Sequence, residues 1–385
     1  MNNIHFRPYI KVYMNEDENE VFLSRPLTDG DRGNTYEIED YVALLFKLIS
    51  KGNYTEEFII NEISNKYPGS YNEIKDTLKF LSENKYITHI ENDSELLMND
   101  DLKKYDRILP LWSEFETQTT SRFDIQNNLM SKKVGIIGCG TIGSEIVSQL
   151  VAYGVNDFIL MDNDVVDRTN LTRQTLFSLR DINQPKVSVL KDFIESRIEN
   201  SSVFISKKLF STEEDLTIFK DVDILVFAAD MSNLQKIQSN DIITPENIME
   251  NFSCKHNIPI FITGGYKGHT GRVFPITIPN KTHSLSCLID NLLLKNKNLK
   301  NDFTIDLNKN SNISLSSTSE MSTIVGSIIS FEIIKFLSDI IPVMLFNKVL
   351  YIEFQNYTVG QIVVPEENFK CSCMLQLVDN GLKLN

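Results

Sequence analysis

The sequence predicts an α/β protein: a Rossmann-like, mostly parallel sheet preceded by a small winged-helix-like α+β domain. Three observations predict this architecture. Residues 131–385 alternate short apolar segments with helical segments, as doubly wound sheets do. Residues 134–143 read VGIIGCGTIG, an apolar strand that runs directly into a glycine turn. Residues 1–95 combine short alternating strands with three helical segments, which suggests a separate small domain.

The small domain begins with two strands, because apolar and polar residues alternate over Tyr9–Met14 and Glu20–Leu23. Three helical segments and a returning strand follow: Glu37–Ser50, Tyr54–Lys66, Tyr71–Asn84 and Tyr86–Ile90. Residues 96–130 are polar and charged without a strong period, so we expect them to form a linker. We further expect Glu20–Leu23 to be an exposed strand that can accept a peptide strand along its edge.

The large domain is expected to span residues 131–385. Its five predicted strands are Lys133–Gly138, Phe158–Met161, Val203–Leu209, Asp223–Ala228 and Ile258–Ile262. A strongly apolar helix over Ser322–Ser338 and a terminal hairpin of Val349–Phe354 with Val359–Val364 follow. Residues 292–318 are rich in Asn, Lys and Ser, which predicts a mobile insertion.

Composition excludes several classes of function. The formal net charge is −14, which disfavours nucleic acid as a partner because phosphate binding depends on clustered Lys and Arg. No uninterrupted apolar run reaches the roughly 18 residues of a membrane span, and the N-terminus lacks a signal pattern. Five cysteines in a long chain fit a reduced protein better than a disulfide framework, so we expect a cytoplasmic location.

The glycine turn predicts a nucleotide site. Gly138, Gly140 and Gly143 allow a tight turn and a close approach of the backbone to phosphate at the start of a helix. Asp162 ends the next strand, 19 residues after Gly143, where an acid can hold ribose hydroxyls. Asp164 follows two residues later and is a further nucleotide-binding candidate. These features alone would also fit an NAD oxidoreductase.

Basic and amide residues after the second strand favour a nucleoside triphosphate over a hydride carrier. Asn170 and Arg173 are three residues apart, so on a helical turn they would share a face, and Gln174 follows directly. Lys186 follows Pro185 at the expected start of the next helix, where the ammonium and the helix N-terminus would both attract phosphate. Each basic residue alone would be interpreted as an ordinary exposed surface residue, but together they indicate phosphate binding.

Metal sites are predicted at two places. Asp230 ends a predicted parallel strand, where a carboxylate oxygen would suit Mg²⁺ and where a helix N-cap is the alternative reading. His283, Cys287, Cys371 and Cys373 could form a zinc site, although neither cysteine group has the paired C-x-x-C form of structural zinc hooks. Alternatively, these residues are degenerate remnants of such hooks and bind no zinc.

Over residues 100–385 the chain resembles the ubiquitin-activating-enzyme-like superfamily, which includes the adenylating enzymes of thiamine and molybdopterin biosynthesis. The resemblance rests on GxGxxG at Gly138–Gly143, DND at Asp162–Asp164, NLTRQ at Asn170–Gln174, Lys186 and Asp230. NLTRQTLFS at Asn170–Ser178 and PNKT at Pro279–Thr282, with the preceding small domain, are most similar to the microcin C maturation adenylyltransferases.

The resemblance implies an ATP- and Mg²⁺-dependent adenylyltransferase that activates a carboxylate, a C-terminus or an acidic side chain, of a ribosomally synthesised precursor peptide in bacteriocin maturation. It implies a peptide-clamp role for residues 1–95, of the kind called a RiPP recognition element. It also implies a homodimer in which Arg107 reaches the partner's nucleotide. Two alternatives stay open: adenylation of a sulfur-carrier or ubiquitin-like protein, and a non-catalytic peptide-delivery scaffold.

Overall fold

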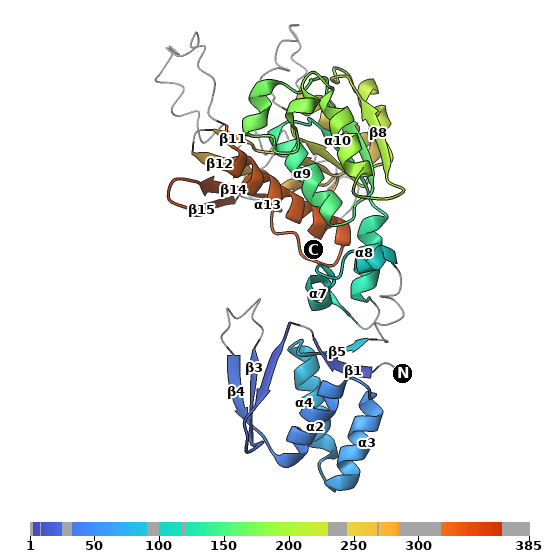
Figure 1. Ribbon diagram of the computed structural model, residues 1–385, viewed down its shortest axis with the longest axis vertical. Coiled ribbons are helices and arrows are strands. Elements are labelled where there is room, and N and C mark those ends of the chain that lie inside the picture. The colour runs from blue at the N-terminus through green and yellow to red at the C-terminus, as the bar shows by residue number, and fades with distance from the viewer. Residues whose placement is uncertain are drawn as a thin grey trace. The chain divides into compact units, whose positions relative to one another are not determined.

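The structure is a computed structural model that describes residues 3–7, 9–24, 33–90, 100–117, 120–229, 245–267, 269–282, 284 and 317–363. The chain divides into two compact units, Met1–Asn127 and Asn128–Asn385 (Figure 1). Mixed α/β structure with a mostly parallel sheet confirms the predicted fold class.

The first unit contains a three-stranded antiparallel sheet, a two-stranded pair and three helices. The sheet has the order β2-β3-β4, and β1 pairs with β5. These elements are β1 (Asn3–Phe6), β2 (Lys11–Met14), β3 (Glu20–Ser24), β4 (Gly33–Glu37), α2 (Asp40–Lys51), α3 (Glu56–Lys66), α4 (Tyr71–Glu83) and β5 (Ile87–Ile90). The sequence pattern missed β1 and β4 because both are short, and β4 is largely polar.

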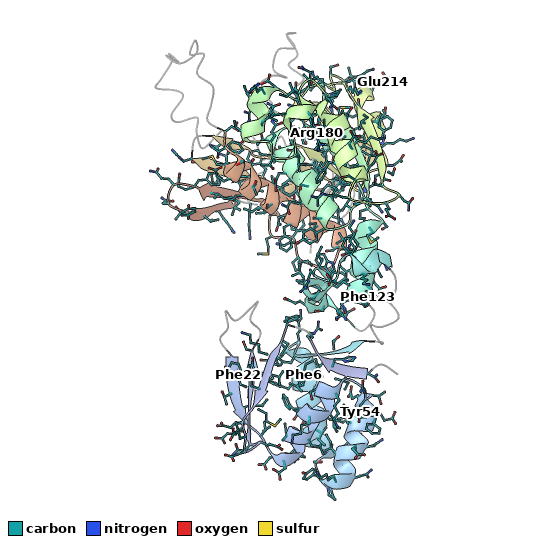
Figure 2. The ribbon with its side chains drawn as sticks, in the orientation of Figure 1. Phe6, Phe22, Tyr54, Phe123, Arg180 and Glu214 are labelled. Atoms are coloured by element: carbon teal, nitrogen blue, oxygen red, sulfur yellow. The ribbon has the colours of Figure 1, made fainter. Side chains whose placement is uncertain are left out.

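Apolar faces at helical spacing hold this unit together. On α2 the buried positions are Ala43, Leu45, Phe46, Leu48 and Ile49. Phe46 contacts Phe6 of β1 with ring centroids 5.5 Å apart, and Tyr54 stacks on Phe58 at 4.7 Å; Phe6 and Tyr54 are labelled in Figure 2. The N-cap of α3 is Thr55, whose hydroxyl accepts a hydrogen bond from the Phe58 N–H.

The expectation that Glu20–Leu23 forms an exposed edge strand is wrong. β3 lies between β2 and β4 and pairs with both of them, and its Val21 and Leu23 are buried. A strand that is hydrogen bonded on both sides cannot accept a third partner. Among the described strands of this sheet, the edges are β2 and β4.

The predicted linker, residues 96–130, is largely helical over its described residues, 100–117 and 120–130. They contain α6 (Asp100–Lys103), α7 (Leu109–Trp112), η1 (Ser113–Phe115) and α8 (Arg122–Met130). Trp112 is buried and its indole N–H donates to the Gln126 amide oxygen at 2.9 Å. The Lys85 ammonium donates to the Glu114 carbonyl at 3.1 Å and the Thr88 hydroxyl to the Glu116 carboxylate at 3.3 Å. These two hydrogen bonds tie the segment into the first unit, which extends to Asn127.

The second unit is built on a six-stranded sheet with the order β13-β10-β9-β6-β7-β8. Its strands are β6 (Lys133–Ile137), β7 (Asp157–Met161), β8 (Ser202–Ser206), β9 (Ile224–Phe227), β10 (Ile260–Ile262) and β13 (Ile276–Thr277). All pairs are parallel except β10–β13. The chain moves from β6 outward to β8 and then returns to β9 on the other side of β6. Ligands bind at such a switch point, at the carboxyl ends of the strands.

Helices and a second sheet cover this core. The longer helices are α9 (Thr141–Ala152), α10 (Lys186–Glu195), α11 (Pro245–His256) and α13 (Ser319–Ser338). The second sheet is antiparallel, with β11 (Tyr266–Lys267), β12 (Thr270–Val273), β14 (Lys348–Glu353) and β15 (Thr358–Val363). Figure 1 shows α13 running beside this sheet, and it packs against both α9 and β12.

By length and composition alone, α13 is apolar enough to cross a membrane. However, 61% of its most apolar window is buried inside the fold. Core helices of soluble proteins have the same composition, because a helix that is apolar on all sides can be buried in protein as well as in lipid. Its packing against α9 makes it a core helix of the second unit.

Candidate active site

The glycine turn between β6 and α9 leaves open space at only one of its three motif glycines. Gly138 has a φ of 94°, and a Cβ there would overlap the backbone of Ala228 and Ala229. A Cβ on Gly143 would overlap the Gly138 carbonyl oxygen. Gly140 has nothing within 4 Å of a Cβ position. The outer two glycines are therefore required by protein packing, and the central one faces space that a ligand can fill.

That space lies at the N-terminus of α9, for which Gly140 is the N-cap residue. The first turn of a helix has N–H groups without intrahelical partners and carries partial positive charge. A phosphate group fits such a position, since the backbone can approach it closely where a side chain is absent.

Asp162 lies beside this turn, directly after β7. It is buried, and its two carboxylate oxygens accept the N–H of Cys139 at 2.6 Å and the N–H of Asp164 at 2.7 Å. Burial raises the pKa of Asp162, while the two backbone hydrogen bonds and the charge of Lys186 act in the opposite direction. Each oxygen retains a further lone pair, so the carboxylate can also accept hydrogen bonds from ribose hydroxyls.

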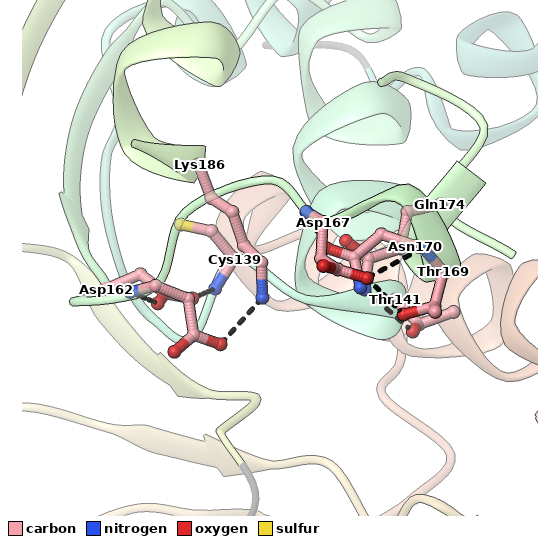
Figure 3. A network of polar contacts seen from close by, with 9 residues as sticks. Cys139, Thr141, Asp162, Asp167, Thr169, Asn170, Gln174 and Lys186 are labelled. Atoms are coloured by element: carbon pink, nitrogen blue, oxygen red, sulfur yellow. Dashed lines mark hydrogen bonds and ion pairs between the residues drawn. The ribbon is translucent and has the colours of Figure 1, made fainter. Parts of the chain in front are cut away.

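Lys186 is the first residue of α10, and its side chain is only 7% exposed. Its ammonium lies 2.7 Å from a carboxylate oxygen of Asp164, whose side chain is 61% exposed. The Lys186 N–H also donates to the Asp164 carbonyl at 3.0 Å. Figure 3 shows Lys186 above Cys139 and Asp162. A nearly buried cation with a solvent-facing counter-ion can exchange that carboxylate for a phosphate oxygen.

Asn170 lies in a 3-10 turn, η2 (Arg168–Thr172), and Arg173 follows it directly, so the helical turn expected for this pair is of the 3-10 type. Asn170 is buried, and its side-chain oxygen accepts the Asp167 N–H at 2.9 Å (Figure 3). Arg173 is the C-cap of the turn, and its guanidinium donates to the Thr169 carbonyl at 2.8 Å. In this arrangement Asn170 shapes the loop, and Arg173 keeps further guanidinium donors for a ligand.

Gln174 is buried with one polar atom unpaired. Its amide N–H₂ donates to the Thr141 hydroxyl at 3.3 Å, in the first turn of α9. Its side-chain oxygen is buried and has no hydrogen-bond partner among the described residues. A buried acceptor without a donor costs about 1–3 kcal/mol, which a ligand donor would relieve. Our reading of the sequence missed Thr141 and Asp167, although Asp167 and Asn170 show the spacing of a capping pair.

Not every predicted site residue belongs to the described part of the second unit. Arg107 belongs to the first unit, where its side chain is 95% exposed and its guanidinium lies 3.8 Å from the Asp106 carboxylate. Asp230, the four zinc candidates His283, Cys287, Cys371 and Cys373, and nearly all of residues 292–318 lie outside the described residues. The described residues before Asp230 end at Ala229, whose backbone lies against the glycine turn at Gly138. Within the described part of the chain, no group of three or more His, Cys, Asp or Glu residues could hold a metal ion.

Most of the chain matches a known protein family. Residues 105–373 match the ThiF family. The chain is 28% identical over 188 residues to the NEDD8-activating enzyme E1 catalytic subunit of Dictyostelium discoideum, covering 46% of this chain and 40% of that protein. It is 29% identical over 171 residues to the sulfur carrier protein ThiS adenylyltransferase of Bacillus subtilis, covering 43% and 46%. In both cases the chain spans less than half of the relative.

Solved structures match over nearly the whole chain. The structure of E. coli MccB with ATP has a TM-score of 0.69 at 20% identity, covering 96% of this chain and 99% of MccB. PaaA has a TM-score of 0.67 at 17% identity, covering 92% and 98%. At these identities the likeness shows a shared fold, and it agrees with the expected resemblance to the microcin C maturation enzymes. Because the family match spans residues 105–373, more than half of the protein, the chain belongs to the ThiF family.

Proposed function

We propose that this protein is an ATP-dependent adenylyltransferase that activates a carboxylate. In this reaction a carboxylate oxygen attacks the α-phosphorus of ATP, the bond to the bridging oxygen of pyrophosphate breaks, and an acyl-adenylate and pyrophosphate result. One observation carries the proposal: the open space at Gly140 lies at the start of α9, in the same turn that binds the Asp162 carboxylate. Phosphate and ribose sites at this spacing fit one nucleotide.

Each of the following residues has a distinct role in the proposed reaction. The N–H groups at the start of α9 bind phosphate, and Asp162 accepts the ribose hydroxyls. The Lys186 ammonium exchanges its ion pair with Asp164 for one with the phosphates. Arg173 adds a second positive charge beside them. The unpaired oxygen of Gln174 accepts a ligand donor. Asp230 would hold Mg²⁺, which stabilises negative charge on the phosphates when bound.

The substrate in this proposal is a ribosomally synthesised precursor peptide that offers its C-terminus or an acidic side chain. MccB, the microcin C7 biosynthetic enzyme that shares this fold, has been solved in complex with N-formylated MccA. The presence of a separate first unit in addition to the nucleotide unit supports a peptide substrate. We further propose that the protein is a cytoplasmic homodimer that acts in the maturation of a peptide natural product.

Acceptor-dependent exchange of labelled pyrophosphate into ATP tests this function. The acceptors are a peptide encoded beside this gene and a carrier protein that ends in Gly-Gly. Exchange with the peptide, followed by a peptide mass increase of one AMP, is expected for the wild type. Lys186→Ala should remove exchange because it removes the cation that binds the phosphates, while Lys191→Ala, a partly exposed lysine further along α10 that pairs with Glu195, should retain it.

The same experiment separates the alternatives. Exchange with the carrier protein alone would replace the peptide by a carrier as substrate. ATP binding without exchange for either acceptor would favour a peptide-delivery scaffold over an enzyme. Absence of ATP binding would overturn the nucleotide site itself.

A further inference from the structure

The two partners of the Asp164–Lys186 ion pair differ strongly in their exposure to solvent. The Lys186 side chain is 7% exposed, whereas the Asp164 side chain is 61% exposed. Their charged groups lie 2.7 Å apart, where the dashed line ends at Lys186 in Figure 3. The cation is therefore fixed inside the protein and its counter-ion faces solvent. An anion that approaches Lys186 from solvent has to displace the Asp164 carboxylate.

Lys186 needs an anion beside it with or without a nucleotide. It is the first residue of α10, and the positive N-terminal end of a helix disfavours a cation. The first turn of α10 contains no acidic residue that would compensate this charge. The nearby Asp162 carboxylate already accepts two backbone N–H groups. In the free protein Asp164 therefore supplies the negative charge, because a buried ammonium without a counter-ion is strongly unfavourable.

The backbone around Asp164 keeps its carboxylate within reach of Lys186. The Lys186 N–H donates to the Asp164 carbonyl at 3.0 Å, and the Asp164 N–H donates to the Asp162 carboxylate at 2.7 Å. Two residues later, the Val166 N–H donates to the Gln184 carbonyl at 2.8 Å. None of these bonds uses the Asp164 side chain, so they remain when an anion displaces it. The displaced carboxylate stays beside the bound anion and returns to Lys186 when that anion leaves.

This arrangement makes ATP and pyrophosphate compete with a group of the protein itself. The ion pair stabilises the free protein, and a ligand that takes over Lys186 has to offset that stabilisation. The displaced carboxylate also remains negatively charged and repels the phosphates beside it. Both effects lower the affinity for ATP, and both favour the departure of pyrophosphate after the α-phosphate has been transferred.

We propose that Asp164 is an internal competitor of phosphate groups for Lys186, which limits the affinity for ATP and promotes the release of pyrophosphate. This assignment rests on the proposed function in taking a triphosphate as the ligand of Lys186. It makes Asp164 a positioning residue that acts through Lys186, in place of the nucleotide ligand expected from the sequence.

Isothermal titration calorimetry of the full chain with ATP–Mg²⁺ and with pyrophosphate tests the competition. Asp164→Asn keeps the size of the side chain and removes its charge, so both ligands should bind about three- to thirtyfold more tightly than to wild type. Asp164→Glu keeps the charge and should bind both ligands like wild type. Asp192→Asn, the same charge change at an exposed position of α10, should leave both affinities unchanged.

Thermal unfolding separates competition from a purely structural role. Without ligand, Asp164→Asn should unfold at a lower temperature than wild type, because Lys186 loses its counter-ion. Saturating ATP should remove this difference, because phosphate replaces Asp164 in both proteins. In a Lys186→Ala background, Asp164→Asn should leave the unliganded midpoint unchanged, since the ion pair is already absent.

Weaker binding of ATP–Mg²⁺ and pyrophosphate by Asp164→Asn would overturn the assignment and make Asp164 a ligand of the nucleotide or its metal. Equal affinities in wild type, Asp164→Asn and Asp192→Asn would also overturn it and would leave the proposed adenylation intact. Absence of binding of both ligands by wild type would overturn the nucleotide site and the competitor role together. Circular dichroism shows whether each variant is folded, and Asp164→Ser replaces Asp164→Asn if that chain misfolds.

Discussion

At the scale of single residues, three glycines of one motif have two different physical roles. Gly138 and Gly143 allow the β6–α9 turn to pack against itself and against the end of β9. Gly140 is required by neither contact, and its φ of −79° is open to any residue. The fold therefore leaves room for a side chain there, and we attribute its absence to the phosphate group of the proposed nucleotide.

Alanine substitution separates these roles. Gly140→Ala should keep the thermal unfolding midpoint within a few degrees of wild type and weaken ATP binding, because the methyl group enters the phosphate space. Gly143→Ala should lower the midpoint, because overpacking of this kind costs about 1–3 kcal/mol. Differential scanning fluorimetry with and without ATP measures both effects. Equal loss of stability in the two variants would contradict this division.

Glu116 gives the first unit a pH-dependent stability. Burial raises its pKa, against the opposing effects of the Arg122 N–H and charge, Arg7 and Thr88. The Arg122 N–H donates to Glu116 at 2.9 Å, and Arg7 lies 3.9 Å away. A raised pKa means that the folded state holds the proton more tightly than the unfolded state. This contribution to stability is present below the unfolded pKa and is lost as pH rises through the folded pKa.

Glu116→Gln should remove that dependence. Relative to wild type, the variant should gain stability as the pH rises from about 4 through the raised pKa, and the difference should then level off. Urea unfolding followed by the fluorescence of Trp112 measures it, since Trp112 is the single tryptophan and is buried in the same unit. Unfolding midpoints that differ by a constant amount at every pH would show that Glu116 does not titrate in this way.

At the scale of elements, a buried glutamate of the long apolar helix α13 links the helix to the segment that follows it. Glu332 is buried in α13 and pairs with Lys335 one turn later at 2.6 Å. Its second oxygen accepts the N–H groups of Met344 and Leu345 at 2.8 and 3.0 Å. The carboxylate thereby ties the segment after the helix to the helix itself.

Glu332→Ala should destabilise the second unit by several kcal/mol, because it leaves two backbone donors and a largely buried ammonium without their acceptor. Glu320→Ala, which changes an exposed residue in the first turn of α13, should cost less than about 1 kcal/mol. Chemical denaturation monitored by circular dichroism gives both values. A Glu332→Ala loss no larger than that of Glu320→Ala would show that the tie contributes little.

At the scale of the whole molecule, the chain places Arg107 and the nucleotide residues in different units. Within its own chain the Arg107 side chain is 95% exposed and lies 3.8 Å from the Asp106 carboxylate, so it is accessible to a second protomer. We therefore predict that Arg107 completes the site of the partner protomer in a homodimer. Arginine suits this role because its planar fork binds phosphate oxygens bidentately.

Mixed dimers test the prediction. Arg107→Ala and Asp230→Ala homodimers should each be inactive in pyrophosphate exchange, and mixing them after reversible dissociation should restore part of the activity. In the mixed dimer one site has Asp230 from one protomer and Arg107 from the other. Activity that stays absent, although differently tagged protomers co-purify, would place Arg107 outside the partner's site.

Local patterns in the sequence determined a large part of this protein. The β6 strand, the glycine turn and α9 are adjacent in the chain, so apolar spacing and three glycines are sufficient to predict them. The same holds for Asp162 at the end of β7, for Lys186 at the start of α10, and for the three helices of the first unit. In each case the residues that specify the element lie within it or next to it.

Only the tertiary structure decided features that depend on pairing between distant segments. β3 became a central strand because the largely polar β4 pairs with it, and no periodicity in residues 33–37 indicates a strand. The Asp164–Lys186 ion pair and the Gln174–Thr141 hydrogen bond join residues far apart in sequence. The open space at Gly140 exists because surrounding elements leave it unfilled. Such voids are set by the packing of several elements at once, which local sequence periodicity does not encode.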